Sequence, residues 1–300
     1  MATLRSFLSG IIDYAGLFPP AQIDMQTAVK NYAEYRAGED RELLGRFVVP
    51  ASRLAEFGDA SRGVLERGDG SVPWCLSVLV DGHIAEARKT ILAFTSTHMS
   101  GSEAGHALCD AVEVLARTEQ DVSEASAAFP QPIRRFFEVS SVGGARNLLR
   151  AVAARHGSAK IRTGGVTQNA FPASEWVVRF IDACNELAVP FKATAGLHHA
   201  VCGSYPLTYD AESASRAMYG FINVFLASAF IRAGVGEAEA CEILEEKSAD
   251  AFSIHDAGVT WRSHELSCDD LRTTRDQLFL SFGSCSFREP VDEARALDLI

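Results

Sequence analysis

The sequence has few of the features that mark secreted or disulfide-stabilised proteins. Its seven cysteines are odd in number and form no Cys-x-x-Cys pair, which argues against a disulfide framework or a zinc ribbon and favours a reducing compartment. The N-terminal apolar stretch is interrupted by Asp13 and lacks the hydrophobic region and cleavage site of a secretion signal. We therefore expect a cytoplasmic protein.

Long hydrophobic runs and positive charge are also scarce. The longest apolar run, 218–231, contains Asn223 and is too short to span a bilayer, so we expect a buried helix or a subunit contact and no membrane association. Acidic residues outnumber basic ones by 39 to 28, which gives a net charge of -11. A negatively charged chain is a poor ligand for nucleic acids, so no such partner is expected.

What the sequence does contain is a regular alternation of β-rich runs with helical patterns such as 25–36, 142–157 and 174–188. Eight such units predict a single α/β domain over residues 1–300, a closed (β/α)₈ TIM barrel. A doubly wound open sheet is the alternative, but no Gly-rich dinucleotide fingerprint supports it, and no cofactor is expected. The eight runs are 11–18, 44–50, 73–81, 110–117, 133–140, 159–165, 191–197 and 278–286.

A long segment separates the seventh run from the eighth and predicts an insert over about 200–275. Long inserts at this end of a barrel cover the site or make a subunit contact. Because the apolar run inside the insert needs something to cover it, we expect a homodimer. The predicted elements are helices at 212–233, 237–247 and 267–276, and a hairpin at 253–262 that turns at Asp256-Ala257-Gly258.

The alternation of side chains along each strand indicates which residues face the barrel interior. Lys160 and Arg162 share one face of their run, and Lys192 and Thr194 share one face of the next. Isolated buried charges are prohibitively costly, so these groups must pair with one another or surround a polar site. Charges that converge in a concave site favour function over a salt-bridge plug. The same parity places Asp13, Asp81, Glu113, Arg117, Glu138 and Ser281 inside.

Lysine is rare in this chain, which makes its two strand positions informative. Five of the 28 basic residues are lysine, and two of these, Lys160 and Lys192, lie in apolar runs that should be neighbours in the barrel. Lysine, unlike arginine, can lose its proton and become a nucleophile. Burial and a second nearby cation lower its pKa and favour the free amine that Schiff-base formation needs. The alternative is an anion-binding pair, or two buried ion pairs.

These two runs resemble a known family. Lys-Ile-Arg-Thr-Gly-Gly at 160–165 and Lys-Ala-Thr-Ala-Gly-Leu at 192–197 resemble deoxyribose-phosphate aldolase and its class I aldolase relatives, in which a Lys-Thr-x-Thr-Gly strand lies beside a Lys-x-x-Gly-Gly strand. Phe-Gly-Ser-Cys-Ser at 282–286 stands where that family's last strand reads Gly-Thr-Ser. The segments as a whole also resemble bacterial barrel proteins without an established activity.

The resemblance implies an aldolase-type carbon–carbon lyase that acts on a small anionic carbonyl compound. Lys160 would be the Schiff-base nucleophile and Lys192 its electrostatic and proton-relay partner, while Gly283 and Ser284 would bind an anionic tail. The chain departs from the family in three ways. The family's fourth-strand aspartate has no clear match in this chain, so Glu113 or Glu138 would move protons. The insert before the last strand has no counterpart in the family. Arg162 replaces a small residue and suits a substrate carboxylate, which favours a keto acid over an aldehyde phosphate.

Two rival hypotheses remain open. A metal-assisted barrel enzyme would use His198 or His199 with carboxylates such as Glu138 or Asp81, although no spaced ligand motif is present. Adjacent residues of an extended chain point to opposite sides, so only one histidine can readily reach the centre, where it would contact substrate or transfer a proton. A non-catalytic binder of a small anion would keep both lysines in salt bridges, whereas an enzyme would take a small anionic substrate, a keto acid or a sugar phosphate.

Other polar residues of the strand ends are candidates for substrate contacts. Thr194 and Asp81 face the predicted interior, and Asp13 would bind a substrate hydroxyl or pair with a lysine. After Asp13 and Tyr14, which end the first predicted strand, Gly16 and Pro19-Pro20 predict a rigid loop at the rim of the site.

Overall fold

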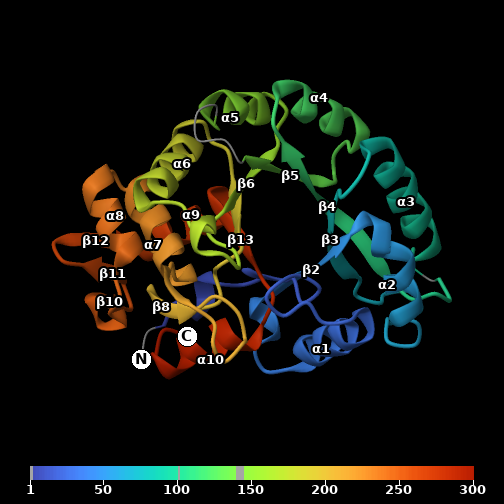
Figure 1. The fold of residues 1–300 in the computed structure, drawn as a ribbon, viewed down its shortest axis with the longest axis horizontal. Coiled ribbons are helices and arrows are strands. Elements are labelled where there is room, and N and C mark those ends of the chain that lie inside the picture. The colour runs from blue at the N-terminus through green and yellow to red at the C-terminus, as the bar shows by residue number, and fades with distance from the viewer. Residues whose placement is uncertain (1–2, 101, 140–144) are drawn as a thin grey trace.

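The computed structural model describes residues 3–100, 102–139 and 145–300. Within them eight parallel strands close into a barrel with helices around it (Figure 1). The (β/α)₈ prediction is therefore confirmed, and the open-sheet alternative is wrong. In order around the barrel, the strands are β1 (Ile12–Tyr14), β13 (Phe279–Ser284), β7 (Phe191–Thr194), β6 (Ser158–Arg162), β5 (Arg134–Val139), β4 (Ala107–Ala116), β3 (Trp74–Leu79) and β2 (Leu44–Pro50).

Some of the outer helices begin at a capping side chain, such as Asp24, Thr118 or Ser267. In α4 the Thr118 and Asp121 side chains form a capping box, which satisfies backbone N–H groups that have no partner within the helix. The apolar side of each helix packs on the barrel, as Leu149 and Val152 do from α5. These helices are α1 (Met25–Ala37), α2 (Leu54–Ala60), α3 (Ile84–Thr97), α4 (Glu119–Ala128), α5 (Ala145–Ala154), α6 (Ser174–Glu186), α7 (Phe221–Arg232), α9 (Cys268–Gln277) and α10 (Arg288–Ala296).

Short 3₁₀ helices complete the connections, and two sequence predictions reach past the described residues. The last residue of the run 133–140 and the first three of the pattern 142–157 lie outside them. The 3₁₀ helices are η1 (Arg5–Phe7), η2 (Arg41–Leu43), η3 (Ala51–Arg53), η4 (Gln168–Ala170) and η5 (Ala249–Ala251).

The segment between β7 and β13 differs from its prediction at its start. Residues 212–220 were predicted as part of a helix, but β8 (Gly203–Pro206) and β9 (Ser215–Met218) form an antiparallel pair there. Phe171, Leu207 and Met218 form a small apolar cluster that fixes this pair on the loop after β6. Strands of four residues are too short for their sequence pattern to be told from that of a helix.

The rest of the segment adds a small sheet and one further helix beside the barrel (Figure 1). The first two strands of this sheet turn at Asp256 and Ala257, where His255 pairs with Gly258. The third strand was not predicted from the sequence. The elements are α8 (Glu237–Glu245), β10 (Phe252–His255), β11 (Gly258–Trp261) and β12 (His264–Ser267).

The apolar run 218–231 is covered within the same chain. Every residue of Phe221–Ile231 is buried, because α7 packs against α6, α8, α9 and β13. The exposed apolar helix that motivated the homodimer prediction is therefore not found, and the dimer stays a prediction without that support. None of the helices in the described ranges is long and apolar enough to cross a membrane.

Asn223 is a buried polar residue of α7, and it fastens this helix to its neighbours. Its side-chain oxygen accepts from the Cys202 N–H at 2.8 Å, and its amide donates to the carbonyls of Ile243 and Glu246 at 2.9 and 2.8 Å. Asn223→Leu is expected to lower the free energy of unfolding by about 2 to 3 kcal/mol, because buried backbone groups lose their partners. Urea denaturation measures the change in the free energy of unfolding. Asn147→Leu, on the exposed side of α5, is the control. Equal losses of stability in the two variants would contradict the prediction.

Candidate active site

Strand register brings the two lysines side by side. Lys160 on β6 pairs with Lys192 on β7, Glu138 on β5 pairs with Lys160, and Ser281 on β13 pairs with Lys192. Because alternate side chains point inward, these four occupy one level of the interior. Arg162 lies one inward-facing position closer to the carboxyl ends of the strands, where it pairs with Thr194.

Six charged residues form an alternating line across this interior, which we call the charge chain: Asp13, Lys192, Glu113, Lys160, Glu138 and Arg162. Lys192 donates to Asp13 at 2.5 Å and to Glu113 at 2.7 Å. Lys160 contacts the other oxygen of Glu113 at 2.7 Å and Glu138 at 2.8 Å. Both amino groups therefore bind the same carboxylate. The charge chain ends at Arg162, whose guanidinium lies 3.9 Å from the carboxylate of Glu138.

Neutral donors hold the buried carboxylates in place. The Ser77 hydroxyl donates to Glu113 at 2.7 Å, and the Ser281 hydroxyl donates to Asp13 at 2.9 Å. The second oxygen of Asp13 accepts from the backbone N–H of Arg46 at 2.8 Å. The Arg46 side chain turns away to a bidentate pair with Asp110, which closes the amino-terminal end of the barrel.

The charge chain sets the protonation of its central members. Burial alone would lower the pKa of Lys160, but the negative charges of Glu113 and Glu138 outweigh it and raise the pKa above its ordinary value. Burial alone would raise the pKa of Glu113, but the charges of Lys160 and Lys192 hold it well below its usual range. The lowered pKa that the sequence predicted for Lys160 is therefore not found in the resting site, because the carboxylates of Glu113 and Glu138 outweigh burial.

Exposure rises along the charge chain from one end to the other. The Lys192 side chain is 1% exposed and Lys160 5%, while Glu138 is 14% and Arg162 53% exposed. Lys192 is therefore enclosed between two buried carboxylates, whereas Lys160 has a partner that reaches solvent. The accessible end of the charge chain is the end that carries Lys160.

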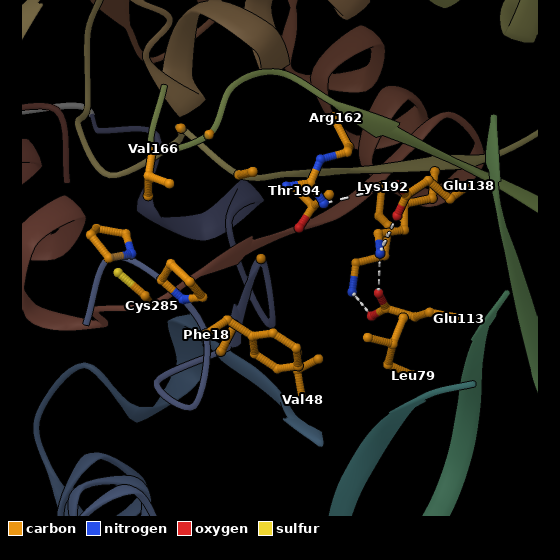
Figure 2. A pocket seen from close by; sticks show the side chains of 18 of the residues that line it. Phe18, Val48, Leu79, Glu113, Glu138, Arg162, Val166, Lys192, Thr194 and Cys285 are labelled. Atoms are coloured by element: carbon orange, nitrogen blue, oxygen red, sulfur yellow. Dashed lines mark hydrogen bonds and ion pairs between the residues drawn. The ribbon is translucent and has the colours of Figure 1, made fainter. Parts of the chain in front are cut away.

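A cavity of about 210 Å³ opens above the charge chain. Figure 2 shows Glu113, Glu138 and Lys192 at one side of it, with Arg162 above them. The remaining wall is largely apolar, and Pro19 and Pro20 stand at the rim where the sequence predicted a rigid loop. Residues of the wall that the sequence did not single out are Ala15, Phe18, Val48, Leu79 and Val166, while Gly165, Ala195 and Gly196 belong to the two lysine motifs.

The glycines of the two lysine runs let their loops meet beside this cavity. A Cβ on Gly164 would lie 2.9 Å from the Cα of Gly196, closer than real side chains approach. Ala195, which lines the cavity, has a φ of 62°, a left-handed conformation that costs free energy in a residue other than glycine. The Thr163 hydroxyl donates to the Ala195 carbonyl at 2.7 Å and holds it there.

The two histidines diverge, as side-chain alternation predicted. His198 lines the cavity, and burial, aided by the neighbouring His199, lowers its pKa to about 4. Its Nδ1 lies 3.4 Å from Ser284 Oγ and 3.5 Å from Cys285 Sγ. His199 instead stacks on Tyr205 and contacts Glu293 of α10 at 3.0 Å.

Three predicted positions lie elsewhere. Asp81 is exposed beyond the end of β3, where it accepts from the Ser52 N–H at 3.2 Å, and it does not line the cavity. Arg117 is exposed after β4 ends, because its backbone already belongs to the cap of α4. Ser284 points its hydroxyl at His198 and is not in the wall, while its neighbour Gly283 is. Parity holds along a strand but not beyond its last residue, which explains the first two errors.

Two residues near the rim were not foreseen as parts of the site. Cys285 follows β13, lines the cavity and contacts the Tyr209 hydroxyl at 3.6 Å. Tyr209 comes from the connection between β8 and β9, so this hairpin reaches the rim. The sequence placed Cys285 one residue beyond Ser284, but only the fold shows that the hairpin arrives there.

Among residues 3–100, 102–139 and 145–300, no group of three or more His, Cys, Asp or Glu side chains is arranged to hold a metal ion. This finding gives no support to the metal-assisted hypothesis for His198 or His199, which stays a prediction. The fold and the contacts together define a (β/α)₈-barrel protein with a buried lysine–carboxylate site at the carboxyl ends of its strands.

No protein-family model matches the chain, and no curated protein matches it. Among solved structures, the chain is similar to lysine/ornithine decarboxylase complexed with cadaverine from Vibrio vulnificus, with a TM-score of 0.41 and 11% identity. The match covers 86% of this chain and 65% of that one, so the chain spans less than two thirds of its length. So distant a likeness says nothing about activity, and the strand pairing alone establishes the barrel.

Proposed function

We propose that this chain is an aldolase-type carbon–carbon lyase that holds a small anionic carbonyl compound as a Schiff base on Lys160. The observation that carries the proposal is that Lys160 and Lys192 share the carboxylate of Glu113 beside an open cavity. A nucleophile, a second cation and proton-transfer groups then lie within hydrogen-bond reach of one another, which is what covalent catalysis by lysine requires.

Lys160 is the better nucleophile of the two because of its surroundings. Lys192 is locked between Asp13 and Glu113, and both of those carboxylates have a serine donor as well. Lys160 pairs with Glu138, and the carboxylate of Glu138 is partly exposed to the cavity. An incoming carbonyl therefore reaches Lys160 without breaking the enclosed half of the charge chain.

The resting ammonium group of Lys160 must lose a proton before it attacks. Glu138, 2.8 Å away, is the acceptor, and transfer between the two partners of an ion pair changes no net charge in the cavity. The protonated Glu138 then returns the proton to the carbinolamine hydroxyl, which leaves as water when the imine forms. Lys192 stays charged and stabilises Glu113 throughout.

Arg162 supplies the contact for the substrate's anionic group. Its guanidinium is half exposed at the mouth and only loosely paired, at 3.9 Å, with Glu138. A carboxylate accepts two parallel hydrogen bonds from such a group, which orients the adjacent carbonyl towards Lys160.

A second candidate function has two observations in its favour. The raised pKa of Lys160 and the carboxylate partners of both lysines also fit a barrel that binds a small anion without turnover. The two functions differ in whether a covalent bond to lysine ever forms.

Borohydride capture separates them. Purified protein incubated with pyruvate and sodium borohydride is expected to gain the mass of one reduced adduct per chain, because the reagent reduces the imine to a stable amine. The same incubation without borohydride is the control. Absence of an adduct with a panel of keto acids and aldehydes, together with thermal protection by one of them, would establish the anion binder instead.

A further inference from the structure

The cavity above the charge chain has a charged side and an uncharged side. In Figure 2, Cys285 lies across the cavity from Glu113 and Glu138, with Phe18 between them and Val166 on the same side as Cys285. Among the described lining residues, the cations are Lys160, Lys192 and Arg162, and all three belong to the charge chain. The side around Cys285 has His198 as its other polar lining group, and we call this pair the distal subsite.

The distal subsite is neutral at neutral pH. Burial lowers the pKa of His198 to about 4 and raises that of the Cys285 thiol to about 11. The Tyr209 hydroxyl, which contacts Cys285 at 3.6 Å, adds another uncharged polar group, because a tyrosine hydroxyl keeps its proton at neutral pH. A phosphate in this subsite would lie in a partly dry environment without a cation, which is unfavourable.

The charge balance of the cavity also disfavours a phosphate at the distal subsite. The charge chain holds three carboxylates and three cations, so its formal charge is zero. Its one loosely paired member is Arg162, which leaves room for a single monoanionic group. A substrate with one carboxylate matches this balance, and a substrate with a second anion at the distal subsite does not.

We infer, on the basis of the proposed Schiff-base function, that the substrate is a 4-hydroxy-2-oxo acid whose hydroxyl group meets His198. Its carboxylate would lie on Arg162, its C2 carbonyl would react with Lys160, and its C4 hydroxyl would extend to the distal subsite. His198 is then a catalytic residue that removes the hydroxyl proton, and sugar phosphates are excluded from the substrate class.

The atoms and electrons of this step balance. His198 Nε2 takes the hydroxyl proton, the C4–O bond becomes a carbonyl, and the electrons of the C3–C4 bond move into a C2–C3 double bond as the imine nitrogen becomes neutral. Glu138, which is ionised again once the imine has formed, takes a proton from solvent at the mouth of the cavity and delivers it to C3, and water hydrolyses the restored iminium ion to release pyruvate and Lys160. The proton on His198 passes to solvent at the rim, and no oxidant or reductant is needed.

Local contacts prepare His198 for this role. With the proton on Nδ1, the ring donates towards Ser284 Oγ at 3.4 Å, and Nε2 is left free to accept. The loop that carries His198 is fixed from below, because Glu293 of α10 accepts from the Ala200 N–H at 3.1 Å and from the Tyr205 hydroxyl at 3.0 Å. The imidazole therefore has a fixed position relative to the cavity.

The test compares cleavage with capture. The probes are 4-hydroxy-2-oxopentanoate, the same acid with a phosphate on C5, and pyruvate, which lacks the distal arm. In the wild type, kcat/KM for the phosphorylated acid is expected to be at least about 10²-fold below that for the unphosphorylated acid. His198→Gln is expected to lower cleavage about 10²-fold more than it lowers borohydride capture of pyruvate. His83→Gln, an exposed position before α3, is the matched control.

The outcomes separate this inference from the proposed function. Capture of pyruvate together with equal or faster cleavage of the phosphorylated acid would overturn the distal subsite and leave the Schiff base intact. Equal effects of His198→Gln on cleavage and capture would overturn the catalytic role of His198. Failure to capture any oxo acid would overturn the proposed function and this inference with it.

Discussion

Lys160→Arg is expected to abolish borohydride capture and to lower turnover by at least roughly 10⁴-fold, as loss of a nucleophile does. Arginine retains a positive charge between Glu113 and Glu138, so the ion pairs of the site have a replacement partner. Its guanidinium does not release a proton at neutral pH and cannot form an imine. The substitution therefore removes the chemistry while it keeps the charge. Mass spectrometry after reduction and a steady-state assay measure the two effects.

Two matched substitutions make this result specific. Lys192→Arg is expected to retain capture with a smaller loss of turnover, because Lys192 acts through its charge. Lys30→Arg, at a lysine that is 78% exposed on α1, is expected to match the wild type. Capture that persists in Lys160→Arg and disappears in Lys192→Arg would reverse the assignment of the nucleophile.

Glu113→Gln is expected to lower the free energy of unfolding at pH 7 by about 3 to 5 kcal/mol, the cost of removing one partner from a buried ion pair. Glu113 is 3% exposed and lies between two ammonium groups. A neutral amide in its place leaves Lys192 with Asp13 alone and Lys160 with Glu138 alone. Urea denaturation followed by circular dichroism measures the change.

The pH dependence of this effect has a definite sign. The lysine charges hold the pKa of Glu113 below its ordinary value of 4.5 in the folded protein, so the unfolded chain binds the proton more readily. The carboxylate therefore stabilises the fold fully above that ordinary value, and its contribution is lost as the pH falls towards the folded-state pKa. The difference between wild type and Glu113→Gln should shrink in acid.

Glu265→Gln is the control for this prediction. Glu265 is exposed on β12, and its substitution is expected to change stability by no more than about 0.5 kcal/mol. A Glu113→Gln variant as stable as this control at pH 7 would show that the charge chain contributes nothing to folding.

The barrel and the meeting of the lysines were predictable because both depend on local periodicity. Runs of alternating residues indicated the eight strands, and parity within them placed Glu113, Glu138, Lys160 and Lys192 on inward faces. Neighbouring runs in sequence become neighbouring strands in a barrel, so the proximity of the two lysines followed. Glu113, the carboxylate that both lysines share, lies two strands away from Lys160. The sequence pattern did not indicate that one carboxylate would contact both lysines.

The remainder depended on contacts that no local pattern encodes. Asp81 and Arg117 were misplaced because the strands end before them and their backbones turn into the following helices. The sign of the pKa change at Lys160 depends on which charge is nearest, and that distance is a tertiary property. The contact between Tyr209 and Cys285 joins residues from two separate connections and requires the complete fold.

Peptide mapping of the borohydride-reduced pyruvate adduct tests the central claim most directly. A modified peptide that carries the added mass on Lys160, with Lys192 unmodified, is the result that the shared carboxylate and the graded exposure of the charge chain lead us to expect. An adduct on Lys192, or protein that stays unmodified while pyruvate is bound, would contradict it.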